Sequence, residues 1–338
     1  MPRLRPLALH HGADAASLLD AGRATPLLGG RIACSLFELI EVDTDGLRRS
    51  RYLAPDNPEL APWLAPFQWP RPPFFDRPRL MGILNVTPDS FSDGGRFVDL
   101  DAATAHALAM VEAGADIVDV GGESTRPGAR EIPAEEELRR VVPVVERLVT
   151  AGVTVSIDTR KADVMRAATQ AGASIVNDVS GLTFDPEAPS AAAASGAMVV
   201  LMHMRDTPAG MNKAPAYRHA ALEIFDELAA RIATAEAAGI ARHRIIVDPG
   251  LCFAKHEPHN LDLLRHLAMY HGLGVPVALG ASRKGWTARL HESWRPAQRL
   301  PASLAAAQWG LAQGIQLFRV HDVAEHRQML DAWEDLCG

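Results

Sequence analysis

MGILNVTPDSFSDGGRF, residues 81–97, is the stretch that decides the fold, because an apolar run passes directly into polar residues and glycines. Its first six residues, among which Asn85 is the one polar side chain, are typical of a buried strand. The Thr-Pro-Asp of residues 87–89 ends that run, and the Asp-Gly-Gly of residues 93–95 indicates a loop. We therefore predict a strand that leaves the core and ends among side chains able to form hydrogen bonds.

The same succession of an apolar run, a loop and a helical run recurs along the rest of the chain. The eight predicted strands are LMGILNV (80–86), ADIVDVG (115–121), TVSIDT (154–159), SIVNDVS (174–180), MVVLMHM (198–204), RIIVDPG (244–250), PVALGAS (276–282) and LFRVH (317–321). Apolar strands that alternate with helices predict a parallel sheet covered by helices. Eight units in about 258 residues predict an α/β fold of the (β/α)8 TIM-barrel type. An open doubly wound sheet is the alternative, but the first strand lacks the GxGxxG turn typical of it.

The part of the chain before this pattern divides into two. Residues 1–53 form an N-terminal appendage, in which we expect a short helix at about residues 15–23 and a β-hairpin around the Asp-Thr-Asp-Gly of residues 43–46. Residues 54–78 are rich in proline, which fixes φ and lacks a backbone donor, so an extended linker is expected there. Its aromatic side chains are able to pack on the barrel domain, residues 79–338.

Composition and charge narrow the classes of function. The net charge of −7 argues against general nucleic-acid binding but permits a local basic pocket for a small anion. Three widely separated cysteines without a CxxC spacing favour neither disulfides nor a structural zinc site, which suits the cytoplasm. No apolar run is long enough to cross a bilayer, so we expect no membrane association. The expected partners are small molecules.

Polar residues gather where the predicted strands end. They are Asn85, Asp119, Asp158, Asn177, Asp178, His203, Asp248, Ser282, Arg283, Lys284, Arg319, His321 and Asp322. In a barrel the carboxyl ends of all strands meet at one mouth, where active sites lie. Any one of these side chains has an alternative role in capping the next helix or in bonding to backbone donors. Their recurrence after every strand favours a shared site.

The residue types at this mouth indicate the substrate. The carboxylates and amide of Asp158, Asn177 and Asp248 suit a flat heterocycle whose edge carries donors and acceptors. Cationic groups follow strands two, seven and eight, and the last two of these are the usual phosphate position in this architecture. These groups are Arg126, Arg283, Lys284, Arg319 and His321. A phosphorylated or pyrophosphorylated substrate is therefore expected, and Asn85 with the loop of residues 89–95 offers oxygen ligands for Mg²⁺.

Two other kinds of site are disfavoured. A metallohydrolase would need paired histidines, but His203 stands alone, and His321 and His326 are five residues apart, which does not place them on one helix face. We expect His326 at the surface. Nothing in the sequence supplies Cys252 with a histidine partner, so a cysteine nucleophile is disfavoured.

Several long motifs resemble those of the bacterial dihydropteroate synthases, the folate-pathway members of the pterin-binding barrel family. They are MGILNVTPDSFSDGG, GADIVDVGGESTRPGA, SIDT, IVNDVSG, LMHMRDTP, DPGLCFAK, GASRKG and FRVHDV, in the order of the family. The resemblance extends from about Arg79 to the C-terminus. It implies condensation of 6-hydroxymethyl-7,8-dihydropterin pyrophosphate with p-aminobenzoate, with help from Mg²⁺, and a homodimer formed through late helices.

The resemblance also implies a role for each motif residue. The residues expected around the pterin are Asp158, Asn177, Asp248, Lys284 and Arg319, with Asp248 on the amino-pyrimidinone edge. Those expected around the pyrophosphate are Asn85, Thr125, Arg126 and His321, and Asn85 is also the expected Mg²⁺ contact. The p-aminobenzoate slot is assigned to Phe91, Pro127, Phe253 and Gly285. The residues expected to take part directly in catalysis are Asp158, Lys284, Arg319 and His321.

The chain departs from the family pattern at three positions near the second substrate. Gly285 stands where a serine usually helps to hold the p-aminobenzoate carboxylate, and Cys252 and Ala254 stand where glycines are common. Two alternatives follow. One is a pterin-binding methyltransferase of the same fold, which has no evident need for the anion-binding runs ESTRPG and SRK. The other is a catalytically idle paralogue that keeps the pterin pocket and acts as a binding partner.

Overall fold

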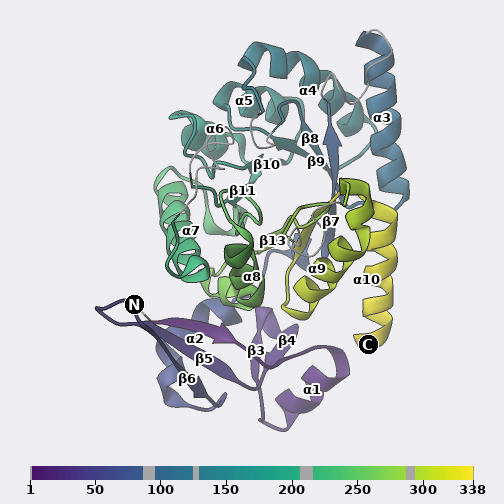
Figure 1. Ribbon diagram of the computed structural model, residues 1–338. Coiled ribbons are helices and arrows are strands. Elements are labelled where there is room, and N and C mark those ends of the chain that lie inside the picture. Colours follow the sequence, from purple (N-terminus) through teal and green to yellow (C-terminus); the bar gives the residue numbers. More distant parts are fainter. Residues whose placement is uncertain (1, 87–95, 125–128, 206–215, 287–293, 338) are drawn as a thin grey trace.

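The computed structural model describes residues 2–86, 96–124, 129–205, 216–286 and 294–337. Its centre is a ring of eight parallel strands (Figure 1). The strands are β7 (Arg79–Asn85), β8 (Ile117–Gly121), β9 (Val155–Asp158), β10 (Ile175–Asp178), β11 (Met198–Met202), β12 (Ile245–Asp248), β13 (Ala278–Leu279) and β14 (Leu317–Val320). They are hydrogen-bonded in the order β12-β11-β10-β9-β8-β7-β14-β13. A parallel bridge between Val247 and Val277 closes the ring, which confirms the predicted (β/α)8 barrel.

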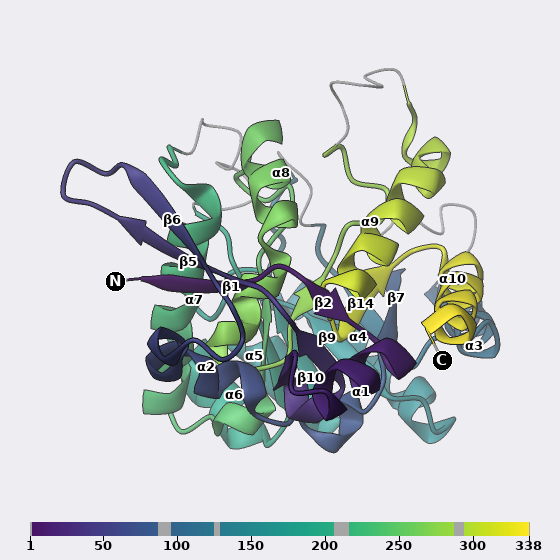
Figure 2. The same cartoon turned by 90° about the horizontal axis from the view of Figure 1, so that it is seen from below.

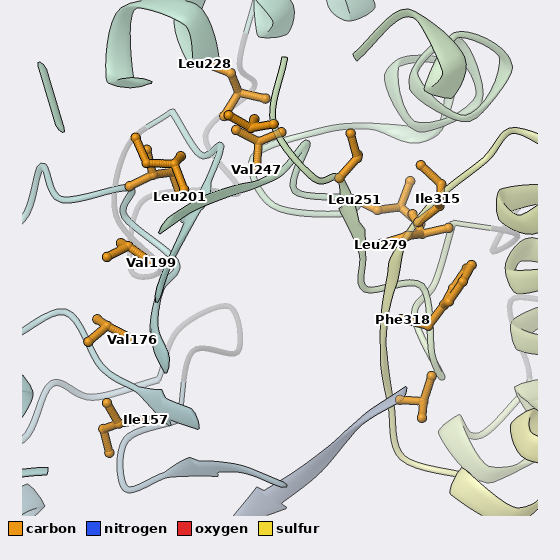
Figure 3. Packing of buried hydrophobic residues seen from close by; sticks show 14 of the residues in the cluster. Ile157, Val176, Val199, Leu201, Leu228, Val247, Leu251, Leu279, Ile315 and Phe318 are labelled. Atoms are coloured by element: carbon orange, nitrogen blue, oxygen red, sulfur yellow. The ribbon is translucent and has the colours of Figure 1, made fainter. Parts of the chain in front are cut away.

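Helices follow the strands and cover the outside of the barrel (Figure 1). They are α3 (Arg96–Glu112), α4 (Ala134–Thr150), α5 (Ala162–Gln170), α6 (Ala188–Ser195), α7 (Ala220–Ala237), α8 (Glu257–Arg265), α9 (Leu300–Ala312) and α10 (Val323–Cys337), and a 3-10 segment, η6 (Leu267–Leu273), precedes β13. One face of each strand packs against these helices in a large apolar cluster (Figure 3). None of the helices in the described ranges is long and apolar enough to cross a membrane.

The opposite face of each strand points into the barrel, because successive side chains of a strand alternate between its two faces. A second apolar cluster joins one residue from each of seven strands, a set that only the barrel interior can bring together. Its strand residues are Met81, Ile117, Ile175, Val200, Ile246, Ala278 and Leu317. These positions lie toward the amino ends of the strands. The interior is therefore apolar at the bottom of the barrel, away from the mouth.

The N-terminal appendage folds into two small antiparallel sheets and a helix, which pack against one side of the barrel next to η6 (Figures 1 and 2). The first sheet contains β1 (Arg3–Pro6), β5 (Phe37–Val42) and β6 (Arg48–Leu53); the second contains β2 (Leu9–His10), β4 (Ile32–Cys34) and β3 (Thr25–Leu27). The helix is α1 (Gly12–Asp20), and η1 (Leu28–Gly30) is a 3-10 turn between β3 and β4. The predicted hairpin is the β5–β6 pair. The appendage has an apolar core of its own.

The expectation of an extended linker at residues 54–78 is wrong. The segment contains η2 (Pro58–Leu60), α2 (Ala61–Gln68) and η3 (Pro73–Phe75). Leu60 and Phe67 join the core of the appendage, whereas Phe75 is buried against the lower layer of the barrel interior. Burial of these side chains outweighs the missing proline donors, and prolines in the first turn of a helix cost little. The division into separate units at residues 53 and 78 stays a prediction.

Phe75 closes the lower end of the barrel, so its truncation should be costly. We expect Phe75→Ala to lower the free energy of unfolding by about 3–5 kcal/mol, because the change removes apolar contacts and leaves a cavity. Urea denaturation measures the effect. Leu47→Ala is the control, since Leu47 is 59% exposed and its loss should change stability by less than about 0.5 kcal/mol. Equal losses in the two variants would show that Phe75 does not support the barrel.

Candidate active site

A layer of polar side chains lies directly above the apolar layer of the barrel interior. Each member lies two positions after an inward-facing residue of the same strand and therefore also points into the barrel. The polar members are Asp119, Asp158, Asn177, Asp248 and Arg319. The first four of these side chains are almost fully buried. The predicted convergence of strand-end residues at one mouth therefore extends into the barrel itself.

Arg319 connects two of the buried carboxylates. Its Nε atom donates to Asp119 Oδ2 over 2.6 Å, and its Nη2 atom donates to Asp158 Oδ2 over 2.7 Å. Asn177 donates to the same Asp119 oxygen over 3.0 Å. Burial raises the pKa of Asp158 to about 7, with the Arg319 charge acting in the opposite direction. One cation thus serves two acids at the floor of the site, which leaves excess negative charge for a ligand with donors.

Two carboxylate oxygens at this floor have no hydrogen-bond partner in the part of the chain that the structure describes. Asp119 Oδ1 and Asp158 Oδ1 are buried and accept no hydrogen bond from any described residue. Buried polar atoms in native proteins are almost always hydrogen-bonded, so an unpartnered pair in a site usually receives a ligand or ordered water. A ligand with an edge of N–H groups would satisfy both atoms.

Asp248 and Lys284 form the second part of the site. The Oδ1 atom of Asp248 accepts the backbone N–H of Gly250 over 2.7 Å. A methyl group at Gly280 would lie 3.5 Å from Lys284 Nζ and 3.6 Å from Asp248 Oδ2, so both side chains face the same small space. Burial raises the pKa of Asp248 and lowers that of Lys284. Their opposite charges hold a donor and an acceptor close together.

Lys284 also fixes the position of the loop after β12. Its Nζ atom donates to the backbone oxygen of Leu251 over 2.9 Å and lies 4.6 Å from the centre of the Phe253 ring. Phe253, predicted for the p-aminobenzoate slot, is therefore next to the predicted pterin residue Lys284. Gly285 follows directly, and a methyl group there would be 3.5 Å from Arg299 Nη1, an ordinary contact.

The cationic groups after β13 and β14 are less available than the sequence indicates. Arg283 is paired with Asp322, its Nε atom lying 3.0 Å from Oδ2, so its charge is balanced within the protein. Burial lowers the pKa of His321 to about 4, and its Nδ1 atom lies 3.1 Å from Ser282 Oγ. His321 is thus neutral near pH 7 and offers hydrogen bonds rather than a fixed positive charge.

Of the other predicted residues, some lie at the mouth or in its surroundings and some lie outside the described ranges. Asn85 is half-buried at the end of β7, beside Gly121 of β8 at the mouth. Phe91, Thr125, Arg126 and Pro127 lie outside the described residues. His326, which we expected at the surface, is 1% exposed, and its Nδ1 atom lies 2.6 Å from the backbone oxygen of Asp322. It lies on the side of α10 that faces the barrel. The sequence comparison of His321 with His326 did not reveal this, because His321 precedes the helix.

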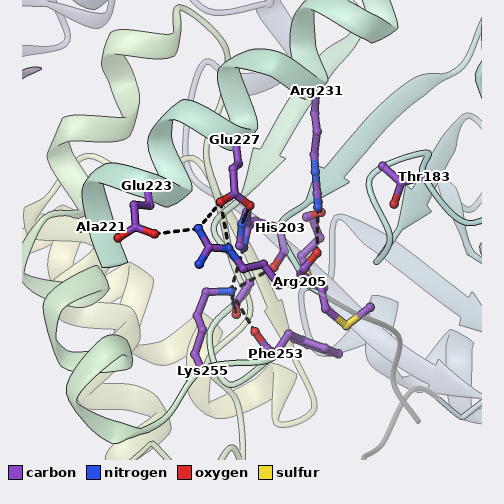
Figure 4. A network of polar contacts seen from close by, with 12 residues as sticks. Thr183, His203, Arg205, Ala221, Glu223, Glu227, Arg231, Phe253 and Lys255 are labelled. Atoms are coloured by element: carbon purple, nitrogen blue, oxygen red, sulfur yellow. Dashed lines mark hydrogen bonds and ion pairs between the residues drawn. The ribbon is translucent and has the colours of Figure 1, made fainter. Parts of the chain in front are cut away.

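His203 and Lys255 support the site from behind rather than lining its floor. His203 Nε2 lies 2.7 Å from Glu227 Oε2, and Lys255 Nζ lies 3.0 Å from His203 Nδ1 (Figure 4). The imidazole therefore accepts from Lys255 and donates to Glu227, which agrees with a pKa lowered to about 3 by burial. Sequence reasoning did not single out Lys255; a lysine directly after an apolar Leu-Cys-Phe-Ala run was the available signal.

A second buried network holds the loop after β8. Glu123 accepts from Arg160 Nη2 over 2.8 Å and from the backbone N–H of Ile132 over 2.9 Å. Lys161 Nζ lies 3.2 Å from Glu123 and 2.6 Å from Glu137. Sequence reasoning did not assign these roles either, because partners 24 to 38 positions away become visible only in the fold. The network fixes both ends of the segment that carries Thr125 to Pro127 in the sequence.

The fold and this site define a class of barrel enzymes in which buried acids, an amide and cations at the mouth hold a polar ring compound. Comparison with known proteins specifies the family. Residues 81–321 match the family model described as "Pterin binding enzyme", and the chain belongs to this family.

Individual relatives agree with the family assignment. The chain is 47% identical to dihydropteroate synthase of Escherichia coli (strain K12) over 249 residues, which covers 73% of this chain and 88% of that protein. It is also 47% identical over 254 residues to a probable bifunctional folylpolyglutamate synthase/dihydropteroate synthase of Haloferax volcanii, but spans only 30% of that longer protein. The structure of Xanthomonas albilineans dihydropteroate synthase with 4-aminobenzoic acid superposes with a TM-score of 0.73 at 48% identity, covering 78% of this chain and 94% of that one.

Proposed function

We propose that this chain is a dihydropteroate synthase. It is a transferase that condenses 6-hydroxymethyl-7,8-dihydropterin pyrophosphate with p-aminobenzoate to give 7,8-dihydropteroate and pyrophosphate. The observation that carries the proposal is the pair of unpartnered acceptors, Asp119 Oδ1 and Asp158 Oδ1, at the floor of a barrel that also presents Asp248. The donor-rich edge of a pterin complements these acceptors. Similarity to named synthases at up to 48% identity supports the same reaction.

The pterin is assigned to the inner part of the site. Asp248 takes the amino-pyrimidinone edge, because an ionised carboxylate is able to accept two N–H groups side by side. Asp158 and Asn177 take the donors and acceptors of the second ring. Lys284 is assigned to the ring carbonyl, and Arg319, which is held by Asp119 and Asp158, is assigned to the flank of the ring. Excluding water from these bonds strengthens them.

The pyrophosphate is assigned to the outer part of the mouth, next to Asn85 and His321. Thr125 and Arg126 are proposed to complete this part. In the described ranges, no three His, Cys, Asp or Glu side chains are grouped as a metal site. Mg²⁺ commonly binds through one or two protein oxygens together with substrate phosphates, and the amide oxygen of Asn85 suits that arrangement. Such an ion would neutralise charge on the leaving pyrophosphate.

The reaction follows from these positions. The C–O bond between the pterin methylene and pyrophosphate breaks as the hydrogen bonds and cations of the outer mouth stabilise the leaving group. The aniline nitrogen of p-aminobenzoate, held beside Phe253, then forms the new C–N bond at the methylene carbon that pyrophosphate has left, and its proton passes to water. Holding the two substrates next to each other in the correct orientation supplies much of the rate enhancement.

Turnover by the purified 338-residue chain tests the proposal. Both substrates with Mg²⁺ should yield 7,8-dihydropteroate, detected by chromatography, and equimolar pyrophosphate. Pterin binding without turnover would instead indicate the idle paralogue, and methyl transfer from a methylated folate would indicate the methyltransferase. The expected homodimer and cytoplasmic location also stay proposals, which ultracentrifugation and cell fractionation test.

Gly285→Ser tests the missing hydroxyl at the second-substrate slot. An added Cβ atom meets only an ordinary contact there, so we expect the KM for p-aminobenzoate to fall by about three- to tenfold, the value of one ordinary hydrogen bond of about 0.5–1.5 kcal/mol. Gly285→Ala is the matched control, since it adds the same carbon without a donor. An unchanged KM for the serine variant would show that other donors already hold the carboxylate.

A further inference from the structure

The appendage contacts the barrel at several places, among them α7, where Arg3 Nε donates to Asp226 Oδ1 over 2.7 Å, and the residues just before α7. The tip of the β5–β6 hairpin presents the backbone oxygens of Asp45 and Gly46 to the residues just before α7. Arg218 Nη2 donates to Asp45, and His219 Nε2 lies 3.0 Å from the Gly46 oxygen. Figure 2 shows the hairpin projecting from the appendage on the side of α7. Because helices of a barrel begin at the carboxyl ends of the strands, this contact lies on the side of the mouth.

The residues held by the hairpin are bonded to Glu223, the first of two acids on α7. The backbone N–H groups of Arg218 and His219 donate to Glu223 Oε1 over 2.7 and 2.8 Å. The other oxygen of Glu223 accepts from Arg205 Nη2 over 2.7 Å. Arg205 Nε also donates to Glu227 over 2.9 Å. Arg205, which follows β11, is thus fixed by the first two turns of α7 (Figure 4).

Glu227 connects Arg205 to the loop after β12. It bonds to His203, and His203 in turn accepts from Lys255. The Lys255 ammonium also donates to the backbone oxygens of Gly250 and Phe253, each over 2.9 Å. Lys255 therefore ties both ends of the loop to the end of β11, as Figure 4 shows.

The loop held in this way has a strained backbone. Cys252 and Ala254 have φ values of +68° and +49°, and Gly250 has +72°. Left-handed φ costs a non-glycine residue about 1 kcal/mol or more, so the loop keeps this shape only if its surroundings impose it. Phe253 lies between the two strained residues, and its ring is next to Lys284. The position of the slot residue thus depends on bonds made outside the loop.

We propose that the β5–β6 hairpin tip, with Arg218 and His219, positions the p-aminobenzoate slot of this enzyme through Glu223, Arg205, Glu227, His203 and Lys255. Arg218 and His219 are positioning residues that touch no substrate. The inference rests on the proposed function and assigns a role to the appendage, which lies outside the matched family region. The contacts form one unbroken series from the appendage to Phe253, and each member is hydrogen-bonded to the member before it and to the member after it.

The test is the double variant Arg218→Ala/His219→Ala of the full chain. Both side chains lie at the surface or half-buried, so the variant should fold with an unchanged thermal midpoint. We expect the KM for p-aminobenzoate to rise about three- to tenfold, the range of measured couplings of this kind, whereas pterin affinity changes less than twofold. Hydrogen exchange of residues 249–256 should become faster at the same time. The single variant Arg218→Lys keeps a donor for Asp45 and leaves His219 unchanged. Its KM should therefore lie closer to the wild-type value than that of the double variant.

Arg49→Ala is the matched control, because Arg49 belongs to the same hairpin and its side chain is 75% exposed. It should leave both KM and hydrogen exchange unchanged. An unchanged KM for p-aminobenzoate in the folded double variant overturns the proposal, whatever the exchange shows. If the wild-type chain has no turnover, the proposed function fails instead, and exchange of residues 249–256 alone then decides whether the hairpin supports the loop.

Discussion

Replacing Asp248 by alanine is expected to weaken pterin binding at least about 100-fold and to abolish turnover. The carboxylate is buried at the end of β12, where its Oδ2 atom faces the same space as Lys284. Removing it leaves two ligand N–H groups without acceptors, and each hydrogen bond to a charged group is worth about 1.5–3 kcal/mol. Calorimetry with 6-hydroxymethylpterin measures the loss directly.

Two further variants serve as controls for the Asp248→Ala result. Asp163→Ala removes an acid whose side chain is 70% exposed on α5 and should leave binding unchanged. Asp248→Asn keeps the size of the side chain but presents an N–H group to the donor edge, so it should bind nearly as weakly as the alanine variant. Wild-type affinity in either Asp248 variant, with a normal circular dichroism spectrum, would show that the pterin does not use this edge.

Replacing Arg319 by methionine is expected to lower the free energy of unfolding by about 3–5 kcal/mol at pH 8. The change leaves Asp119 and Asp158 buried together without their shared cation, and breaking one partner of a buried ion pair costs about that much. Arg283→Met is the control: its pairing with Asp322 is about one-third exposed on the arginine side, so its loss should cost no more than about 1 kcal/mol.

The Arg319 effect should depend on pH in a defined direction. Burial already raises the folded pKa of Asp158 to about 7, and removing the guanidinium moves it further up. Because the folded pKa lies above the unfolded value of about 3.9, unfolding releases a proton and a higher pH favours the unfolded state. The part of the loss that comes from Asp158 is therefore present at pH 8 and disappears as the pH falls below about 7, where this carboxyl is protonated in the folded state with or without Arg319. Denaturation curves at pH 8 and pH 4.5 that show equal losses would contradict this account.

The sequence by itself determined the order of the elements and the ends of the strands at which the site lies. Short apolar runs, helical runs and the polar residues between them are local patterns, and these can be recognised from neighbouring residues alone. That is why all eight strands were predicted in their places and why Asp158, Asn177, Asp248 and Arg319 were selected before their partners were known. Family motifs added the chemistry.

Only the tertiary structure decided which side chains meet. The strands are apolar on both faces near their amino ends, so the sequence did not reveal that Asp119 points inward, toward Arg319 200 positions away. Ring closure and register fix that choice. Burial of Phe67 and Phe75 likewise imposed helical turns on a proline-rich segment, and packing brought Gly46 to His219. Such contacts depend on the positions of distant elements, because hydrogen bonds and apolar burial act only at short range in space.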